Sequence, residues 1–150
     1  MRTTDLRIPL ALLLLRLSVF LVMLMWTIDK FVNPGHAAAV FAKFYFISGL
    51  GPTVIYLIGA IQLAIVVGFV LGIRKRLTYG AVLFLHAVST FSAFKQYFAP
   101  YENVNLLFFA AWPMLAACFT LFYLKDLDTL WTMKPLVTSR EQQPTNGDSP

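Results

Sequence analysis

Four long apolar runs dominate this chain and limit what it can fold into. They cover residues 8–28, 53–73, 77–98 and 104–124, and each is close to the ~20 residues that a helix needs to cross a bilayer. Because hydrocarbon offers no partners for backbone N–H and C=O groups, segments of this kind form helices there. Transmembrane β-strands are about 9–11 residues long and alternate in polarity, which stretches such as IQLAIVVGFVLGI do not. The sequence therefore predicts an all-α bundle of four transmembrane helices.

Composition agrees with a membrane protein and excludes several other classes. The chain is 59% hydrophobic and 13% charged, against about 45–50% and 25% in soluble domains. The net charge of +5 is spread between the apolar runs, so we expect the lipid bilayer and no nucleic acid as partner. The single cysteine, Cys118, excludes an internal disulfide and a cysteine zinc site. His36 and His86 lie at opposite depths, so we predict no metal site.

Basic residues predict the topology of the bundle. They gather before the first run, in the RKR connection between the second and third, and after the fourth. By the positive-inside rule both termini are cytoplasmic, which an even number of spans also requires. We predict one multi-pass membrane domain, residues 1–134, followed by a disordered polar tail, residues 135–150. The aromatic stretch after NPG, residues 36–52, suits either a short interfacial helix or an aromatic belt.

Arg16 stands out because it lies inside the first apolar run. It is roughly 9–12 Å from the start of that span at about 1.5 Å per residue, a depth shared within error by Gln62 and His86. Thr90 follows on the same helix face as His86. No Asp or Glu lies inside any run, so we expect Arg16 to have no buried carboxylate partner from its own chain. These four residues form a candidate pocket for a quinone, a lipid headgroup or an anion; the alternative is an arginine that snorkels to the headgroups and a histidine that ties helices together.

A second polar group is expected at the opposite, outer face. It comprises candidate mouth residues at the end of the first span and around the last connection: Trp26, Asp29, Lys30, Lys95 and Glu102. Asp29–Lys95 or Lys30–Glu102 ion pairs would give a polar entrance to a pocket. The competing interpretation is a hydrated interface with aromatic anchors.

Small residues and a proline predict how the helices pack. Gly68 and Gly72 have GxxxG spacing, which allows close backbone approach within the chain or in a homo-oligomer. Pro113 should kink the fourth helix by freeing the Phe109 carbonyl. No nucleotide loop, HExxH or GxSxG motif is present. We therefore assign no catalytic residue and do not expect a complete enzyme.

Three motifs stand out along the first two spans: LLLLRL around Arg16, WTIDKF at the end of the first span, and IGAIQLAIVVGFVLGIRKR in the second. Together they resemble the DoxX family of small four-helix bacterial membrane proteins. The resemblance covers about residues 10–130 and is that of a divergent member. Gln62 stands where relatives often carry an acid, and only DLD, residues 126–128, matches the closure after the fourth helix.

The resemblance implies a function in the bacterial inner membrane. It suggests an accessory or anchoring subunit of a quinone-linked oxidoreductase or oxidative-stress system, with quinone as cofactor and a soluble or membrane redox protein as partner. Two alternatives remain open. The lone intramembrane cation would also suit a small-solute or anion permease, and the absence of catalytic motifs would suit a purely structural assembly factor.

Overall fold

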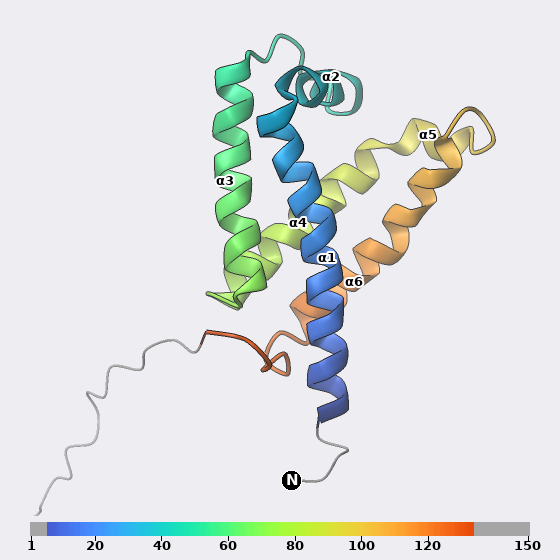
Figure 1. Ribbon diagram of the computed structural model, residues 1–150. Helices are drawn as coiled ribbons and strands as arrows, with labels where there is room; N and C mark the ends of the chain where they lie inside the picture. Colours follow the sequence, from blue (N-terminus) through green and yellow to red (C-terminus); the bar gives the residue numbers. More distant parts are fainter. Residues whose placement is uncertain (1–5, 134–150) are drawn as a thin grey trace, which may run out of the picture.

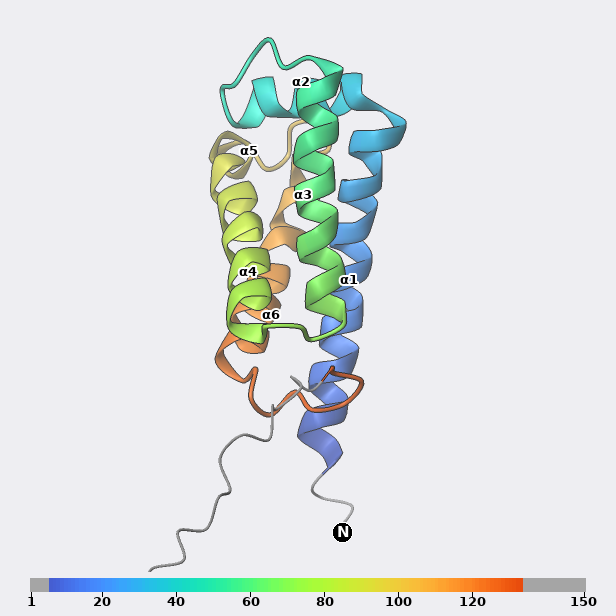
Figure 2. The same ribbon diagram turned by 90° about the vertical axis from the view of Figure 1, so that its left-hand side faces the viewer.

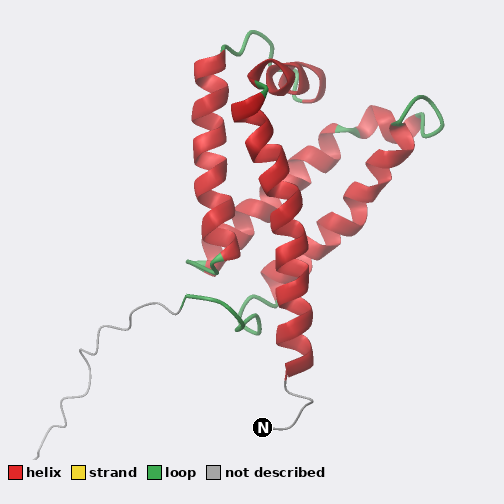
Figure 3. Cartoon of the chain, viewed as in Figure 1, coloured by secondary structure: helices red, strands yellow, loops and turns green. Residues whose placement is uncertain are grey.

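The computed structural model describes residues 6–133, and this part of the chain consists of helices and connecting loops without strands (Figure 3). The predicted disordered tail, residues 135–150, lies outside the described residues. In chain order the elements are α1 (Arg7–Val32), α2 (Pro34–Phe44), α3 (Pro52–Val70), α4 (Lys75–Ser92), α5 (Phe94–Phe98), the 3₁₀ helix η2 (Asn105–Ala110) and α6 (Ala111–Tyr123).

Three of these segments are apolar and long enough to cross a membrane: α1, α3, and η2 together with α6. The prediction of an all-helical protein with membrane-length helices is therefore confirmed. α4 is the least apolar of the four long helices, because Lys75 and Arg76 form its first turn. Large hydrophobic side chains remain exposed on all four, for example Leu14, Leu57 and Phe84. Such a surface suits lipid contact and would be a liability in water.

The long helices pack as two pairs, α1 with α3 and α4 with α6. Figure 1 shows the pairs close together at the end where α1 begins and diverging toward α2. Figure 2 shows α2 lying across that far end, nearly perpendicular to α1 and α3. The buried core lies mainly in the close-packed half and includes Val19, Val66, Phe69 and Val82. The divergence is what leaves room for a cavity near α2.

The helix α2 begins where NPG predicts a turn. The side chain of Asn33 accepts a hydrogen bond from the backbone N–H of His36 at 3.3 Å, and Pro34 occupies the first helical position. Both are favourable at a helix start, because they satisfy or remove backbone donors that have no partner there. A short helix after NPG is therefore correct, and its position at a membrane interface stays a prediction.

Residues 124–133, which we call the strap, cross below the end of α3 and beside the first half of α1 (Figure 2). The N–H of Met133 donates to the carbonyl of Leu71 at 2.9 Å. Gly72 lies beyond the end of α3 with φ +65°, and a Cβ placed there would come within 2.7 Å of the Thr132 side chain. The position of the strap and the positive φ therefore both require glycine at residue 72.

Of the two alternatives for the GxxxG spacing, the structure shows packing within the chain. Gly68 lies in α3 against Thr78 of α4, and Gly72, beyond the end of α3, meets Thr132 of the strap. A homo-oligomer through these glycines stays a prediction. Pro113 acts differently from the prediction. It lies in the first turn of α6, where its missing N–H costs little. In place of the predicted kink within one helix, the 3₁₀ helix η2 ends at Ala110 and the α-helix α6 begins at Ala111.

Candidate functional site

Arg16 is completely enclosed at the close-packed end of the bundle. Its Nη1 donates to Oδ2 of Asp128 at 3.1 Å, and both residues have an exposed fraction of 0%. The Tyr79 hydroxyl donates to the same oxygen at 2.6 Å and accepts from Nη1 at 3.1 Å. Three side chains from α1, α4 and the strap therefore share one network, which we call the Arg16 cluster (Arg16, Tyr79 and Asp128).

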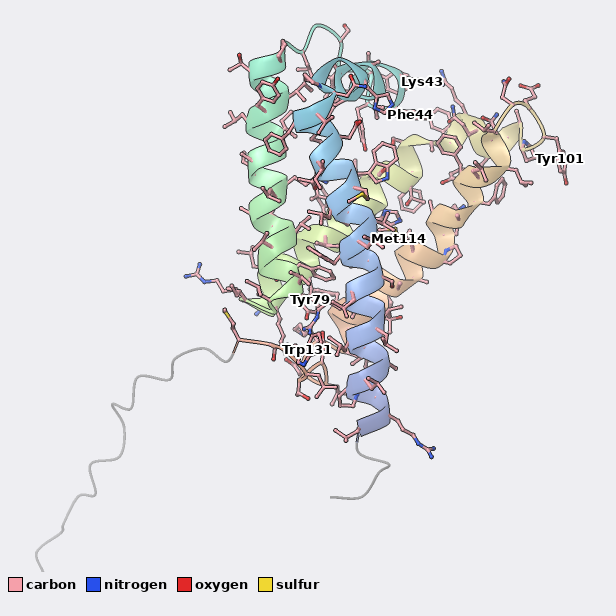
Figure 4. All side chains as sticks on the ribbon, in the orientation of Figure 1. Lys43, Phe44, Tyr79, Tyr101, Met114 and Trp131 are labelled. Atoms are coloured by element: carbon pink, nitrogen blue, oxygen red, sulfur yellow. The ribbon has the colours of Figure 1, made fainter. Side chains whose placement is uncertain are left out.

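Backbone groups of the strap complete the surroundings of this cluster. Arg16 Nη2 donates to the carbonyl of Leu130 at 2.5 Å. Lys75 Nζ donates to the carbonyls of Asp128 and Lys125 at 2.5 and 3.2 Å, and burial lowers the pKa of Lys75 below the usual lysine value. Figure 4 shows Tyr79 and Trp131 at this end of the molecule. The cluster fastens the strap to α1 and α4.

The expectation that Arg16 lacks a carboxylate partner from its own chain is wrong. Asp128 follows the fourth apolar run by four residues, so depth along the spans gives no reason to pair it with Arg16. The strap folds back and carries it to Arg16, 112 positions earlier in the chain. Arg16 therefore neither snorkels to a free surface nor offers an unpaired charge.

The four residues of the predicted pocket lie in different places. Gln62 and His86 line a cavity, whereas Arg16 and Thr90 do not. His86 Nε2 lies 3.1 Å from the carbonyl oxygen of Ala111, and since a carbonyl only accepts, Nε2 carries the proton. The Thr90 hydroxyl donates to the carbonyl of His86 at 2.8 Å. Arg16 and Thr90 therefore do not belong to the pocket wall. Ligand binding by Gln62 and His86 stays a prediction.

The cavity has a volume of about 880 Å³ and lies in the half of the bundle near α2. α1, α4, α6 and η2 supply most of its wall, α2 covers its end, and α3 contributes Ile58 and Gln62. Met114, labelled in Figure 4, lies on the α6 side. The wall is mainly apolar, with polar groups spread along it that include Asp29, Lys30, Gln62, His86, Ser89 and Tyr97. This size and composition are typical of small-molecule sites, which are cavities of about 300–1,000 Å³ lined mainly by apolar side chains with a few polar groups.

Three of the five predicted mouth residues, Trp26, Asp29 and Lys30, line this cavity, and Lys95 and Glu102 do not. The predicted ion pairs do not form among the described residues. Asp29 Oδ2 instead lies 2.7 Å from Nδ1 of His36, and Lys95 Nζ lies 5.4 Å from the centre of the Phe46 ring. His36, in the first turn of α2, is only seven residues from Asp29 along the chain, so Asp29 meets this partner before any residue of the last connection.

Sequence reasoning missed Asp128, Tyr79 and Lys75. One signal could have pointed to Asp128. A deeply placed arginine needs an anionic partner, and the acidic DLD motif lies just beyond the last span. Tyr79 and Lys75 carry no comparable signal, because a tyrosine and a lysine near a helix end are ordinary membrane-boundary residues.

The cavity offers binding and orientation to a ligand. It places one histidine, two tyrosines and one lysine on an apolar wall. In residues 6–133 no three His, Cys, Asp or Glu residues group together as metal ligands. Comparison with family models, curated proteins and solved structures finds no match for this chain.

Proposed function

We propose that this chain is a four-span membrane protein that binds an elongated, lipid-like molecule in its cavity and acts as an accessory or anchoring subunit. The cavity of about 880 Å³ is the observation that supports this proposal. Its apolar wall would hold a hydrocarbon chain, and its scattered polar groups would orient one polar head. Among residues 6–133 we find no constellation of catalytic side chains that would favour a complete enzyme.

The topology in this proposal has both termini in the cytoplasm. The start of α1 and the strap lie at the same end of the bundle (Figure 2), and the basic RKR connection joins α3 and α4 there. The cavity then belongs to the outer half of the membrane. Green fluorescent protein and alkaline phosphatase fused in turn to the C-terminus test this: fluorescence without phosphatase activity is expected, and the reverse pattern would contradict the topology.

The resemblance to the DoxX family supports a bacterial inner-membrane location and a quinone as one candidate ligand. A quinone has an isoprenoid tail and a ring whose carbonyl oxygens accept hydrogen bonds. Gln62 lies on the cavity wall, and its side-chain amide could donate such a bond. A redox partner protein is part of the same proposal, and recovery of one partner in mild detergent would support it.

Ligand binding can be measured by fluorescence, because Trp26 lines the cavity. The chain has three tryptophans, so the W112F/W131F variant leaves Trp26 as the single reporter. Titration with a short-chain ubiquinone or a brominated lipid in detergent micelles should quench Trp26 saturably. Only linear quenching, as from random partition into the micelle, would contradict a binding site.

A matched pair of variants locates the binding. Ala110 is exposed and lines the cavity, so Ala110→Phe should reduce affinity at least tenfold by occupying the space. Ala116 is also exposed but faces away from the cavity, and Ala116→Phe should leave affinity unchanged. Equal effects of the two substitutions would place the ligand elsewhere.

The permease alternative has lost the observation that motivated it. Arg16 is paired with Asp128 at 3.1 Å and does not face the cavity, so it is no longer a lone intramembrane cation. The structural alternative predicts no saturable ligand binding in the titration above.

A further inference from the structure

Lys30 differs from the other polar residues of the cavity because its ammonium group has one hydrogen-bond acceptor and no ion-pair partner among the described residues. It lies on α1 near the α2 end, lines the cavity and is 9% exposed. Its Nζ donates to the carbonyl of Trp26 at 3.0 Å. An ammonium group has three donors, so two hydrogens remain for another acceptor.

Asp29 is the one acidic residue among those that line the cavity, and it does not neutralise Lys30 by direct contact. The Asp29 carboxylate is held by His36 at 2.7 Å, and no described residue forms an ion pair with Lys30. The remaining elements around the cavity contribute neutral polar groups such as Gln62 and Tyr97 and the histidine His86. A buried cation without a counter-charge is costly, and an anion supplied by a ligand would offset that cost.

The backbone fixes Lys30 in this position. Gly59 of α3 lies directly behind it, and a Cβ on Gly59 would come within 3.2 Å of the Lys30 Cβ and 3.0 Å of the Phe31 ring. The close approach of α1 and α3 at this glycine fixes the Cβ of Lys30, and the hydrogen bond to Trp26 holds its ammonium at the cavity wall. The charge is therefore held at one end of the site.

The cavity also has the length of a single acyl chain. Its residues on α1 run from Ser18 to Lys30, a distance of about 18 Å at 1.5 Å per residue. One leaflet of the hydrocarbon core is about 15 Å thick, half of ~30 Å. A chain that starts with its head at Lys30 would reach the Ser18 end of the cavity.

From this arrangement we propose that the ligand is a single-chain amphiphile with an anionic head, whose carboxylate or phosphate binds Lys30. This rests on the proposed function, because it names the ligand class of the same cavity. The ammonium of Lys30 binds the head at the outer end, and the acyl chain lies along the apolar wall of α1, α4 and α6. A neutral quinone or alcohol of the same length would fill the cavity without engaging the charge.

The test compares acid and neutral ligands of equal shape. Dibromostearic acid, the matching dibromo-alcohol and a brominated lysophosphatidate are titrated against Trp26 fluorescence in the W112F/W131F chain, at a pH that ionises the acid. We expect the acid to bind at least tenfold more tightly than the alcohol. The phosphate arm identifies the source: tighter binding of the lysophosphatidate points to a lipid headgroup, and tighter binding of the acid points to a fatty acid.

Substitution of Lys30 separates charge from shape. Lys30→Met keeps the length of the side chain and should bring acid and alcohol affinities within about twofold, with alcohol binding retained as evidence of an intact cavity. Lys30→Arg should keep the preference for the acid. Lys43→Met is the matched control, since Lys43 is an exposed lysine on α2 outside the cavity wall, and it should change nothing.

Two results would overturn the inference, and they are distinguishable. If acid and alcohol bind with equal affinity to the W112F/W131F chain that keeps Lys30, the proposal of an anionic head is wrong, while the proposal of a lipid-like ligand is retained. If none of the amphiphiles nor the quinone quenches Trp26 saturably, the proposed function fails together with the inference.

Discussion

The two ends of the bundle differ in whether a buried charged side chain has an oppositely charged partner. At the strap end, Arg16 and Asp128 are both fully buried, and each is bound by the other and by Tyr79. At the α2 end, Lys30 is nearly as buried but has only a backbone carbonyl as partner, and Gln62 makes no side-chain hydrogen bond with any described residue. The first arrangement holds parts of the chain together, and the second leaves polar groups available for a ligand.

The difference shows how a buried charge can be used. Removing two charges from water costs several kcal/mol per ion, and good geometry with additional hydrogen bonds is needed to recover that cost. The strap supplies a carboxylate and a backbone carbonyl for Arg16. Nothing comparable from the described chain reaches Lys30. We therefore expect substitutions at the strap end to change stability and those in the cavity to change binding.

The largest effect is expected from Asp128→Ala. It would leave Arg16 buried without its counter-charge, which typically costs about 3–5 kcal/mol of folding free energy. Unfolding of the purified protein in detergent micelles measures the change. Asp126→Ala is the control, because the side chain of Asp126 is 87% exposed, and its effect should be much smaller. Equal losses from the two substitutions would contradict the buried pair.

Replacing both charged partners sharpens this result. The double variant Arg16→Met with Asp128→Leu should be more stable than either single variant, because no lone buried charge remains. If the two single losses simply add in the double variant, Arg16 and Asp128 do not interact.

Tyr79→Phe should have the next largest effect. It removes the hydroxyl that donates to Asp128 at 2.6 Å, and a hydrogen bond to a charged group typically contributes about 1.5–3 kcal/mol. Tyr123→Phe is the control, because Tyr123 is 71% exposed. The same unfolding measurement applies, and a loss below that of the control would argue against the network.

Gly72→Ala tests the strap through its backbone. An alanine in the left-handed region costs about 1–2 kcal/mol, and its methyl group would also displace Thr132. Limited proteolysis should cut the strap faster in this variant. Gly51→Ala serves as the control, since no atom lies within 4 Å of a Cβ there. Unchanged cleavage of Gly72→Ala would show that the strap does not depend on this glycine.

Gln62→Leu should have the smallest effect on stability, within about 0.5 kcal/mol, because it breaks no described side-chain hydrogen bond. Its effect should appear as changed affinity for a ligand with a polar head. A large loss of stability without any change in binding would show that Gln62 stabilises the fold and does not contact a ligand.

Much of the helical arrangement could be predicted from local sequence. The runs 8–28 and 53–73 agree within a few residues with α1 (Arg7–Val32) and α3 (Pro52–Val70). Apolar length determines that these segments are helical, and Pro34 and Pro52 mark where helices begin. These signals are carried by neighbouring residues, so they can be read along the chain.

The candidate site could be predicted only in part. Trp26, Asp29, Lys30, Gln62 and His86 were selected as polar residues near apolar runs, and all five line the cavity. The grouping of Arg16 with Gln62 and His86 was wrong, because depth along a helix does not specify which face meets which neighbour.

The sequence by itself determined that the chain forms apolar helices long enough to cross a membrane. Tertiary structure decided that Asp128 returns to Arg16 across 112 positions and that the two helix pairs diverge toward α2 to leave a cavity (Figure 1). Helix formation depends on contacts within one or two turns, which the local sequence contains. Ion pairing and cavity shape depend on the angle between helices and the path of the strap, which arise only when all parts pack together.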